Sequence, residues 1–384
     1  MRTLLVGYRA ADLTPQLLEG DVTCHVLDVY HRHAIEKVHH AKVICAPHLP
    51  EGPWDVIRFK TGPKIHSGEL ALDLLQECTA LAHGDRNVAA PAGSSASTEL
   101  SMGRRHSCRL EIDFDGRERD RNDLLDKIAD NPKRVRSFKA EWPASVPGGE
   151  KLMFTSYPGC FCHRRLDEGG LALAEVASRE LCSRIADFKS QISHFRLLDM
   201  GCGCGLVGLL IADRLWHSNN RKTEQFANRT IEQSNSSPVE QSNNSSIEQS
   251  NNSSIEQSNN SSIDQSNNRT ISLVMVDSHS RAVEAARENA AKFGIPAEVI
   301  LSDNGTPARM DGTFDVFVGN PPYYSDYRIA EVFLDTAKRA LKPGGVCYTV
   351  VKNAAGLKPV QERYFPSVEV IPRRNYSVLK SVKV

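Results

Sequence analysis

The chain has 384 residues, 40% of them hydrophobic, and its 47 basic side chains balance its 47 acidic ones. This length predicts two or three domains, and the balanced charge excludes the strong global field of a highly basic nucleic-acid-binding or membrane-surface protein. We expect neither a secretory signal nor a membrane span, because no apolar run approaches ~18 residues, and we expect a cytoplasmic location in which the ten cysteines remain free thiols.

Residues 1–95 show an alternating α/β pattern. Strand candidates are residues 3–7, 24–29 and 54–59, and residues 69–81 form an amphipathic helix pattern. After residue 83, the pattern predicts a turn into a further strand.

One stretch of this pattern recurs later in the chain. Gly52–Arg58 is similar to Gly312–Val318, and each is followed by a helix, a turn and an apolar strand. Two unrelated α/β halves would also look alike at this level, but we interpret the similarity as an internal duplication. The first copy has neither Gly-x-Gly-x-Gly nor Asn-Pro-Pro, so we expect it to keep the shape without the ligand chemistry.

Three basic clusters separate the two copies, at residues 104–109, 117–121 and 132–139. Acidic side chains interleave with the first two clusters, which favours a solvated surface. The third cluster places Arg134 and Arg136 near the aromatic Phe138 without acids. That pattern suits phosphate contacts with RNA, and a solvated face is the alternative.

Cys160, Cys162 and His163 precede a predicted helix at residues 171–185. A structural zinc site usually combines two ligand pairs, with two to four residues between paired cysteines. Here only one residue separates Cys160 from Cys162, and no second ligand pair lies near them in the sequence. We therefore expect no metal.

A glycine-rich turn is the organising feature of the second copy. The apolar run Phe195–Met200 predicts a buried strand, Gly201, Gly203 and Gly205 follow it, and residues 206–215 have a helical pattern. A strand, a glycine turn and a helix are the layout of a nucleotide-binding crevice at the carboxyl end of a sheet, and an ordinary tight turn between a strand and a helix is the alternative. The spacing and the absence of Gly-Lys-Ser/Thr argue against a phosphate-binding loop.

Residues 218–269 interrupt this pattern with an octapeptide repeat of Ile-Glu-Gln-Ser-Asn-Asn-Ser-Ser type. One apolar residue in eight cannot build a core, so we expect this insertion to be disordered. It follows the first helix of the unit, and such helices end at the sheet edge opposite the ligand crevice. The position therefore explains why the insertion is tolerated.

Three further β-rich runs end in polar side chains. They are 271–277 ending at Asp277, 299–303 ending at Asp303, and 314–323, in which a strand leads into Asn320, Pro321, Pro322 and Tyr323. Helices at 281–293 and 328–341, a strand at 346–351 and an antiparallel pair at 367–371 and 377–384 complete the pattern. We predict an α/β fold with a Rossmann-like, seven-stranded, mostly parallel sheet and helices on both faces.

The order of glycine loop, two acids and Asn-Pro-Pro-Tyr resembles the class I S-adenosylmethionine-dependent methyltransferases that methylate an exocyclic or amide nitrogen. Pro158–Gly169, with its Pro-Gly-x-Phe start and Leu-Asp-x-Gly end, is similar to the ribosomal RNA guanine-N2 methyltransferases of small-subunit type C and large-subunit type G. The resemblance implies a degenerate methyltransferase-like N-terminal half (residues 1–145), which is a candidate for RNA binding. It also implies a catalytic C-terminal half (residues 146–384), with ribosomal RNA or a ribosomal subunit as the partner.

The resemblance also implies roles for the residues after the fourth strand. Asn320, Pro321, Pro322 and Tyr323 are the candidate catalytic residues. Asn320 Oδ1 and the Pro321 carbonyl would accept the two N–H hydrogens of the target amine, while Tyr323 would stack on a flipped base. Asn320 is also a candidate cofactor contact.

The other implied contacts are to the cofactor, S-adenosylmethionine. The three loop glycines would approach its methionine part, and Asp199 would order the loop or meet the amino group. Asp277 would bind the ribose hydroxyls, and Asp303 the adenine amine.

Asn-Pro-Pro-Tyr does not by itself define the acceptor. Adenine N6 and the glutamine amide of release factors are alternatives, but release-factor enzymes have a helical N-terminal domain and DNA adenine enzymes usually add a target-recognition domain. Guanine N2 of small-subunit RNA is therefore the leading interpretation, although Tyr323 stands where guanine enzymes often have Phe, and Cys204 where a small residue is commoner. A second alternative is a non-catalytic RNA-binding assembly factor, which would not bind the cofactor. The sequence does not define the oligomeric state.

Overall fold

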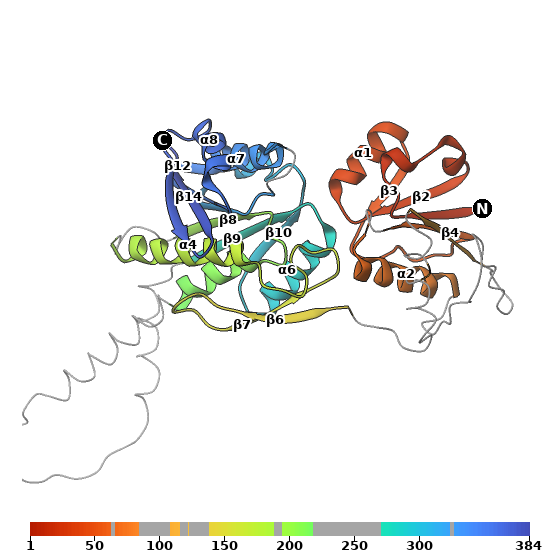
Figure 1. Ribbon diagram of the computed structural model, residues 1–384, viewed down its shortest axis with the longest axis horizontal. Helices are drawn as coiled ribbons and strands as arrows, with labels where there is room; N and C mark the ends of the chain where they lie inside the picture. Colours follow the sequence, from red (N-terminus) through yellow and green to blue (C-terminus); the bar gives the residue numbers. More distant parts are fainter. Residues whose placement is uncertain are drawn as a thin grey trace, which may run out of the picture.

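The computed structural model describes residues 1–62, 66–83, 108–115, 122, 138–187, 194–217, 270–322 and 326–384. The predictions for the strand after residue 83, for the basic cluster at 117–121, for Arg134 and Arg136, for the octapeptide repeat and for Tyr323 therefore concern residues outside this set. The described residues form two α/β units that lie side by side (Figure 1). No helix in the described ranges is long and apolar enough to cross a membrane.

The N-terminal half contains a five-stranded, all-parallel sheet with the strand order β3-β2-β1-β4-β5. Its elements are β1 (Arg2–Val6), η1 (Ala10–Asp12), η2 (Pro15–Leu18), β2 (Asp21–Val26), α1 (Val29–His39), β3 (Lys42–Cys45), β4 (Val56–Thr61), α2 (Gly68–His83) and β5 (Arg109–Phe114). Two hydrophobic clusters fill its two faces.

The predicted strand at 24–29 is too long. It ends at Val26, because the Asp28 side chain accepts a hydrogen bond from Tyr30 N at 2.7 Å and caps α1. His40, with φ of 50°, ends this helix in the left-handed region.

The C-terminal half contains a seven-stranded sheet with the order β10-β9-β8-β11-β12-β14-β13, in which only the pairs that involve β14 are antiparallel. Its strands are β8 (His194–Met200), β9 (Thr270–Asp277), β10 (Ala297–Leu301), β11 (Phe314–Gly319), β12 (Leu341–Val351), β13 (Glu369–Arg373) and β14 (Tyr376–Val382). This architecture confirms the predicted fold class.

Helices cover both faces of this sheet (Figure 1). The helices are α4 (Glu168–Asp187), 206–217 and α6 (Ser280–Lys292) on one face, with α7 (Arg328–Ala340), α8 (Ala354–Glu362) and the short η3 (Ala308–Met310) as the remaining ones. The sheet is buried on both faces. Leu197 of β8 packs in the hydrophobic cluster that includes residues of α4 and α6 (the α4 and α6 cluster), and the next residue, Leu198, packs in the cluster that includes residues of α7 and α8 (the α7 and α8 cluster). A sheet buried on both faces is typical of parallel architectures.

The hairpin of β6 (Ala140–Ala144) and β7 (Leu152–Ser156) belongs to the core of the C-terminal half. Trp142 and Phe154 stack with ring centroids 5.4 Å apart, and both are part of the α4 and α6 cluster. This core therefore begins ahead of the predicted boundary at residue 145, and we propose a domain boundary before β6.

Both sheets place their first five strands in the same order, third, second, first, fourth and fifth. This common order agrees with the predicted duplication. It also aligns the loops that follow corresponding strands, so the two halves can be compared loop by loop.

The two halves meet at the loops that follow β2 and β9. Val29 N donates to Ser278 O at 3.0 Å, and Ser280 N donates to Leu27 O at 2.7 Å. Arg281 at the start of α6 is only 1% exposed, and its guanidinium pairs with Asp73 and Glu77 of α2. A buried guanidinium of this kind is tolerated because carboxylates satisfy it.

Thr270 pairs with His194, so β9 starts at the amino-terminal edge of the sheet. The helix at 206–217 starts at the opposite edge and ends near this one. The flanks of residues 218–269 therefore lie away from the glycine loop.

Candidate functional site

The glycine loop lies at the carboxyl end of β8 and is bonded to β9. Gly201 N and Cys202 N both donate to Val276 O, at 2.8 and 3.1 Å. Gly203 has a φ of 56°, which disfavours other residues, and a Cβ added there would meet nothing within 4 Å. Gly203 therefore offers bare backbone on an open side of the loop, where a ligand can approach.

Asp277, the last residue of β9, faces the same loop. Its Oδ2 accepts from Gly203 N at 2.9 Å, and its Oδ1 accepts from His279 N at 2.9 Å. Burial raises the pKa of this carboxyl, and the backbone hydrogen bonds oppose that shift. A carboxylate offers about four acceptor positions, so this side chain keeps acceptor capacity for hydroxyl groups beside Gly203.

Asp199 is the next-to-last residue of β8, near the carboxyl end of the strand, and only 1% of it is exposed. Its Oδ2 accepts from Gly208 N at 2.8 Å, which ties β8 to the helix at 206–217. Burial raises its pKa to about 7. This contact is with the helix and not with the glycine loop, so both predicted roles of Asp199 remain predictions.

Asp303 lies two residues beyond the end of β10, in the turn rather than in the strand. Its Oδ2 is 3.0 Å from Nδ1 of His33, which belongs to α1 of the N-terminal half. The predicted adenine-binding acid is therefore placed at the contact between the two halves, which the sequence did not indicate.

Asn320 directly follows β11, the strand next to β8. Its Nδ2 donates to Asp167 Oδ2 at 2.8 Å, and Oδ1 has no partner among the described residues. Pro321 is buried and Pro322 is partly buried, whereas Tyr323 is outside the described set. The acceptor oxygen of the amide is thus available at the carboxyl edge of the sheet.

Asp167 is a site residue that the sequence reasoning missed. It lies in the Pro158–Gly169 stretch directly before α4, where its Oδ1 accepts from Gly169 N at 3.1 Å and its carbonyl accepts from Leu171 N at 2.9 Å. This is the geometry of a helix N-cap. Burial raises its pKa, against hydrogen bonds from the α4 backbone and Asn320. An acid just before a predicted helix was the available signal.

The beginning of the same stretch packs beside the contact between the halves. Gly159 has a φ of 98°, and a Cβ added there would lie 2.8 Å from Cε1 of His279. Burial lowers the pKa of His279 to about 4. The Pro-Gly sequence therefore allows close packing against the loop that carries Asp277.

In the described part of the chain, one cluster has side chains spaced as metal ligands, namely Glu150, Asp213 and His217. His217 lies 3.0 Å from Glu150 and 3.1 Å from Asp213, so the three groups satisfy one another as ion pairs. The cluster includes none of the cysteines that suggested a zinc site.

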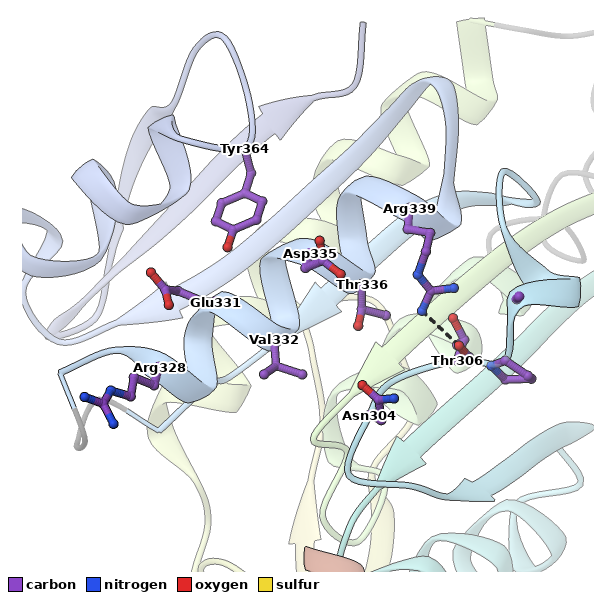
Figure 2. A pocket seen from close by; sticks show the side chains of 11 residues that line it. Asn304, Thr306, Arg328, Glu331, Val332, Asp335, Thr336, Arg339 and Tyr364 are labelled. Carbon is purple, nitrogen blue, oxygen red and sulfur yellow. Dashed lines mark hydrogen bonds between the residues drawn. The ribbon is translucent and has the colours of Figure 1, made fainter.

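A cavity of about 600 Å³ lies between α7 and the turn after Asp303 (Figure 2). Arg339 lies at one side of the cavity and donates a hydrogen bond to Thr306 O at 2.9 Å. The lining residues are Asn304, Thr306, Pro307, Ala308, Arg328, Glu331, Val332, Asp335, Thr336, Arg339 and Tyr364. Neither the glycine loop nor Asn320 lines this cavity, which is therefore separate from the predicted acceptor site.

The family described as Methyltransferase small domain matches residues 151–265 and 260–380. Ribosomal RNA small subunit methyltransferase C of Pseudomonas syringae pv. syringae is 23% identical over 236 residues, which cover 60% of this chain and 51% of that protein. The protein of the same name from Pseudoalteromonas translucida is 30% identical over 109 residues, 27% of this chain and 31% of that protein. The matches span about half or less of these curated relatives.

Among solved structures, a 16S rRNA N2 G1207 methyltransferase of T. thermophilus, in complex with AdoMet and guanosine, superposes with a TM-score of 0.62. The match covers 100% of this chain and 88% of that chain, at 15% sequence identity. At this identity the likeness shows the fold, including the N-terminal half.

Proposed function

We propose that this chain, which belongs to the methyltransferase small domain family, transfers a methyl group from S-adenosylmethionine to an exocyclic amine of ribosomal RNA. Guanine N2 of small-subunit RNA is the first candidate acceptor. The observation that carries this proposal is the amide of Asn320. Its nitrogen donates a hydrogen bond to Asp167, and its oxygen has no hydrogen-bond partner among the described residues.

The residues at the carboxyl edge fit the cofactor. Gly203 presents backbone with no atom within 4 Å of a Cβ position, and Asp277 lies next to it with acceptor capacity for a ribose diol. S-adenosylmethionine supplies a methyl group that its sulfonium already activates. The protein must therefore bind, orient and exclude water, and orientation alone can supply a large part of the rate.

Asn320 would make the methyl-accepting amine a better nucleophile. The lone pair of an exocyclic amine is delocalised into the base, so the amine is a poor nucleophile. Hydrogen bonds from both N–H groups to fixed acceptors favour the localised lone pair. Asn320 Oδ1 would accept one hydrogen, and the Pro321 carbonyl the other, with no N–H on that proline to compete.

The curated relatives named above support ribosomal RNA as the acceptor, and the similar solved structure contains guanosine. An amine inside a base-paired helix cannot reach the crevice, so the target base must leave its stack. Tyr323 remains our candidate for stacking on the flipped base.

One observation weighs against the glutamine alternative. The N-terminal half is a parallel α/β sheet, whereas the resemblance to release-factor enzymes would imply a helical N-terminal domain. Adenine N6 remains the alternative acceptor. A non-catalytic role in ribosome assembly is disfavoured because Gly203, Asp277 and Asn320 are all present and placed at one edge.

Two measurements test the proposal. Calorimetry should detect binding of S-adenosylmethionine to the full chain, and a protein that gives no binding heat would be a non-catalytic factor. Mass mapping of ribosomal RNA from cells with and without this protein should show one missing methyl group on a guanine of the small subunit. If the missing methyl group belonged to an adenine, adenine N6 would replace guanine N2 as the proposed acceptor. If the RNA were unchanged, the proposed function would be overturned.

A further inference from the structure

We propose that Asp167 is a positioning residue that holds the Asn320 amide with its oxygen toward the acceptor amine. This inference rests on the proposed function. It starts from the 2.8 Å hydrogen bond from Asn320 Nδ2 to Asp167 Oδ2, which joins residues 153 positions apart in the chain. An ionised carboxylate only accepts hydrogen bonds, so its partner on the amide must be the nitrogen.

The amide needs such a partner because its two ends have nearly the same shape and opposite chemistry. The oxygen accepts hydrogen bonds, and the nitrogen donates two. A rotation of half a turn about the side chain's last bond would aim donors at the N–H groups of the target base. That orientation would repel the acceptor amine and leave its lone pair delocalised. Asp167 removes this alternative because it offers no donor.

The position of Asp167 is fixed by the helix that follows it. Its Oδ1 accepts from Gly169 N at 3.1 Å, and its carbonyl accepts from Leu171 N at 2.9 Å, so α4 orients the carboxylate. A Cβ added at Gly170 would lie 2.6 Å from Asp167 Oδ2. The Gly-Gly start of α4 therefore leaves room for this oxygen to point at Asn320.

The two carboxylate oxygens thus have separate tasks. Oδ1 caps α4, and Oδ2 holds Asn320. Serine is as good a helix cap as aspartate, but its single, shorter hydroxyl cannot also reach Asn320. Asparagine has the length to present its amide oxygen to Asn320. Substitutions can therefore separate the two tasks.

The experiment compares D167S, D167N and the control E168Q, which removes the neighbouring exposed carboxylate. Single-turnover methyl transfer is measured on small-subunit RNA from cells that lack this protein. We expect D167S to lower the rate constant about 10–100-fold, by analogy with the loss of a partner that orients a metal-binding side chain. The Kd for S-adenosylmethionine and the Tm should stay close to the wild type. D167N should be faster than D167S, and E168Q should match the wild type.

Coupling to Asn320 distinguishes positioning from a general structural role. Adding D167S to an N320A protein should lower the residual rate no further, because the group that Asp167 holds is already absent. Wild-type turnover in D167S would overturn the inference, and so would parallel losses of Tm, cofactor affinity and rate. An inactive wild-type protein would instead overturn the proposed function, and this inference with it.

Discussion

The two halves have sheets with the same strand order but different space above the carboxyl ends of their strands. After β1, a Cβ added at Gly7 would lie 2.3 Å from Lys60 O and 2.7 Å from Cε1 of His66, so the chain itself fills that position. After β8, the equivalent Gly201 is also closely packed, because an added Cβ would lie 2.6 Å from Cζ of Phe333, but Gly203 two residues further on faces open space. The fold is common to both halves, and the chemistry depends on what the loops leave open.

The acids near the ends of the second strands show the same contrast. Asp28 and Asp277 each accept from the backbone N–H two residues on, at 2.7 and 2.9 Å. The other oxygen of Asp28 accepts from the Ser278 hydroxyl at 2.9 Å, whereas that of Asp277 accepts from Gly203 N in the loop. The acid of the N-terminal half therefore contacts the other half, whereas that of the C-terminal half contacts its own glycine loop.

The strongest test of this contrast is Asn320→Ala. Removal of a preorganised group that acts on the reacting atoms typically costs about 10²–10³-fold in kcat, and we expect at least that loss in methyl transfer. Cofactor affinity by calorimetry should change little. The matched change at the end of β4, Thr61→Ala, should leave the rate unchanged. An N320A protein with normal turnover would contradict the assigned role.

A second test removes the acid of the crevice. Asp277→Ala deletes the acceptors proposed for the ribose hydroxyls, and hydrogen bonds to charged groups are worth about 1.5–3 kcal/mol each. We expect a loss of cofactor affinity of about 10–100-fold, measured by calorimetry. Asp28→Ala is the control, because it should cost about 1 kcal/mol of stability through the lost cap and leave affinity nearly unchanged. Equal affinity losses in both variants would remove the distinction between the two acids.

Glycine substitutions should separate stability from binding. Gly7→Ala forces a methyl group against Lys60 O and must also adopt a left-handed φ, so we expect a loss of about 2–5 kcal/mol in the free energy of unfolding. Gly203→Ala has room for the methyl group but must adopt a left-handed φ, at a cost of about 1–2 kcal/mol. It should also weaken cofactor binding, which Gly7→Ala should not do beyond the effect of unfolding. Chemical denaturation and calorimetry measure the two quantities.

The smallest predicted effect is on pH dependence, to which the two halves contribute differently. In the N-terminal half, burial lowers the pKa of His25 and His66 to about 4. The unfolded chain binds more protons between about 4 and 6.5, so stability falls as the pH falls through this window. In the C-terminal half, the lowered pKa of His279, about 4, acts in the same direction, but burial also raises the pKa of Asp199 to about 7. The folded state then binds the extra proton, so this contribution is lost as the pH rises from the unfolded value of 3.8 through 7.

Hydrogen exchange at pH 5 and pH 7, resolved by peptide, can measure this difference. Acid should lower protection in the N-terminal half more than in the C-terminal half. His66→Gln should reduce the acid sensitivity of the N-terminal half, and a variant as sensitive as the wild type would show that His66 is not its source.

The fold was predictable where apolar runs are long, as in Phe314–Gly319, which is buried on both faces. Elements with a weaker signal were missed. In α1, only Val29 and Ile35 are buried, so no apolar stripe marks the helix. The alternation of β5, Arg109–Phe114, was present in the sequence, but its charged residues were interpreted as a basic cluster with interleaved acids.

The candidate site shows a similar division. The glycine loop, Asp277 and Asn320 could be predicted to lie at one edge of the sheet, because each directly follows or ends a strand and the carboxyl ends of parallel strands meet there. The contacts of Asp167 and His33 join residues 153 and 270 positions apart. No local spacing indicates such contacts, because they arise from packing between distant segments.

The buried cation at the start of α6 has a consequence for protein engineering. Arg281 belongs to the C-terminal half, but its counter-charges, Asp73 and Glu77, come from the N-terminal half. A chimaera that takes one half from a relative must transplant this trio as a unit. Otherwise the buried guanidinium would lose its carboxylate partners, at a cost of about 3–5 kcal/mol in stability. Such a chimaera would then be destabilised even if the backbones of its two halves fitted together.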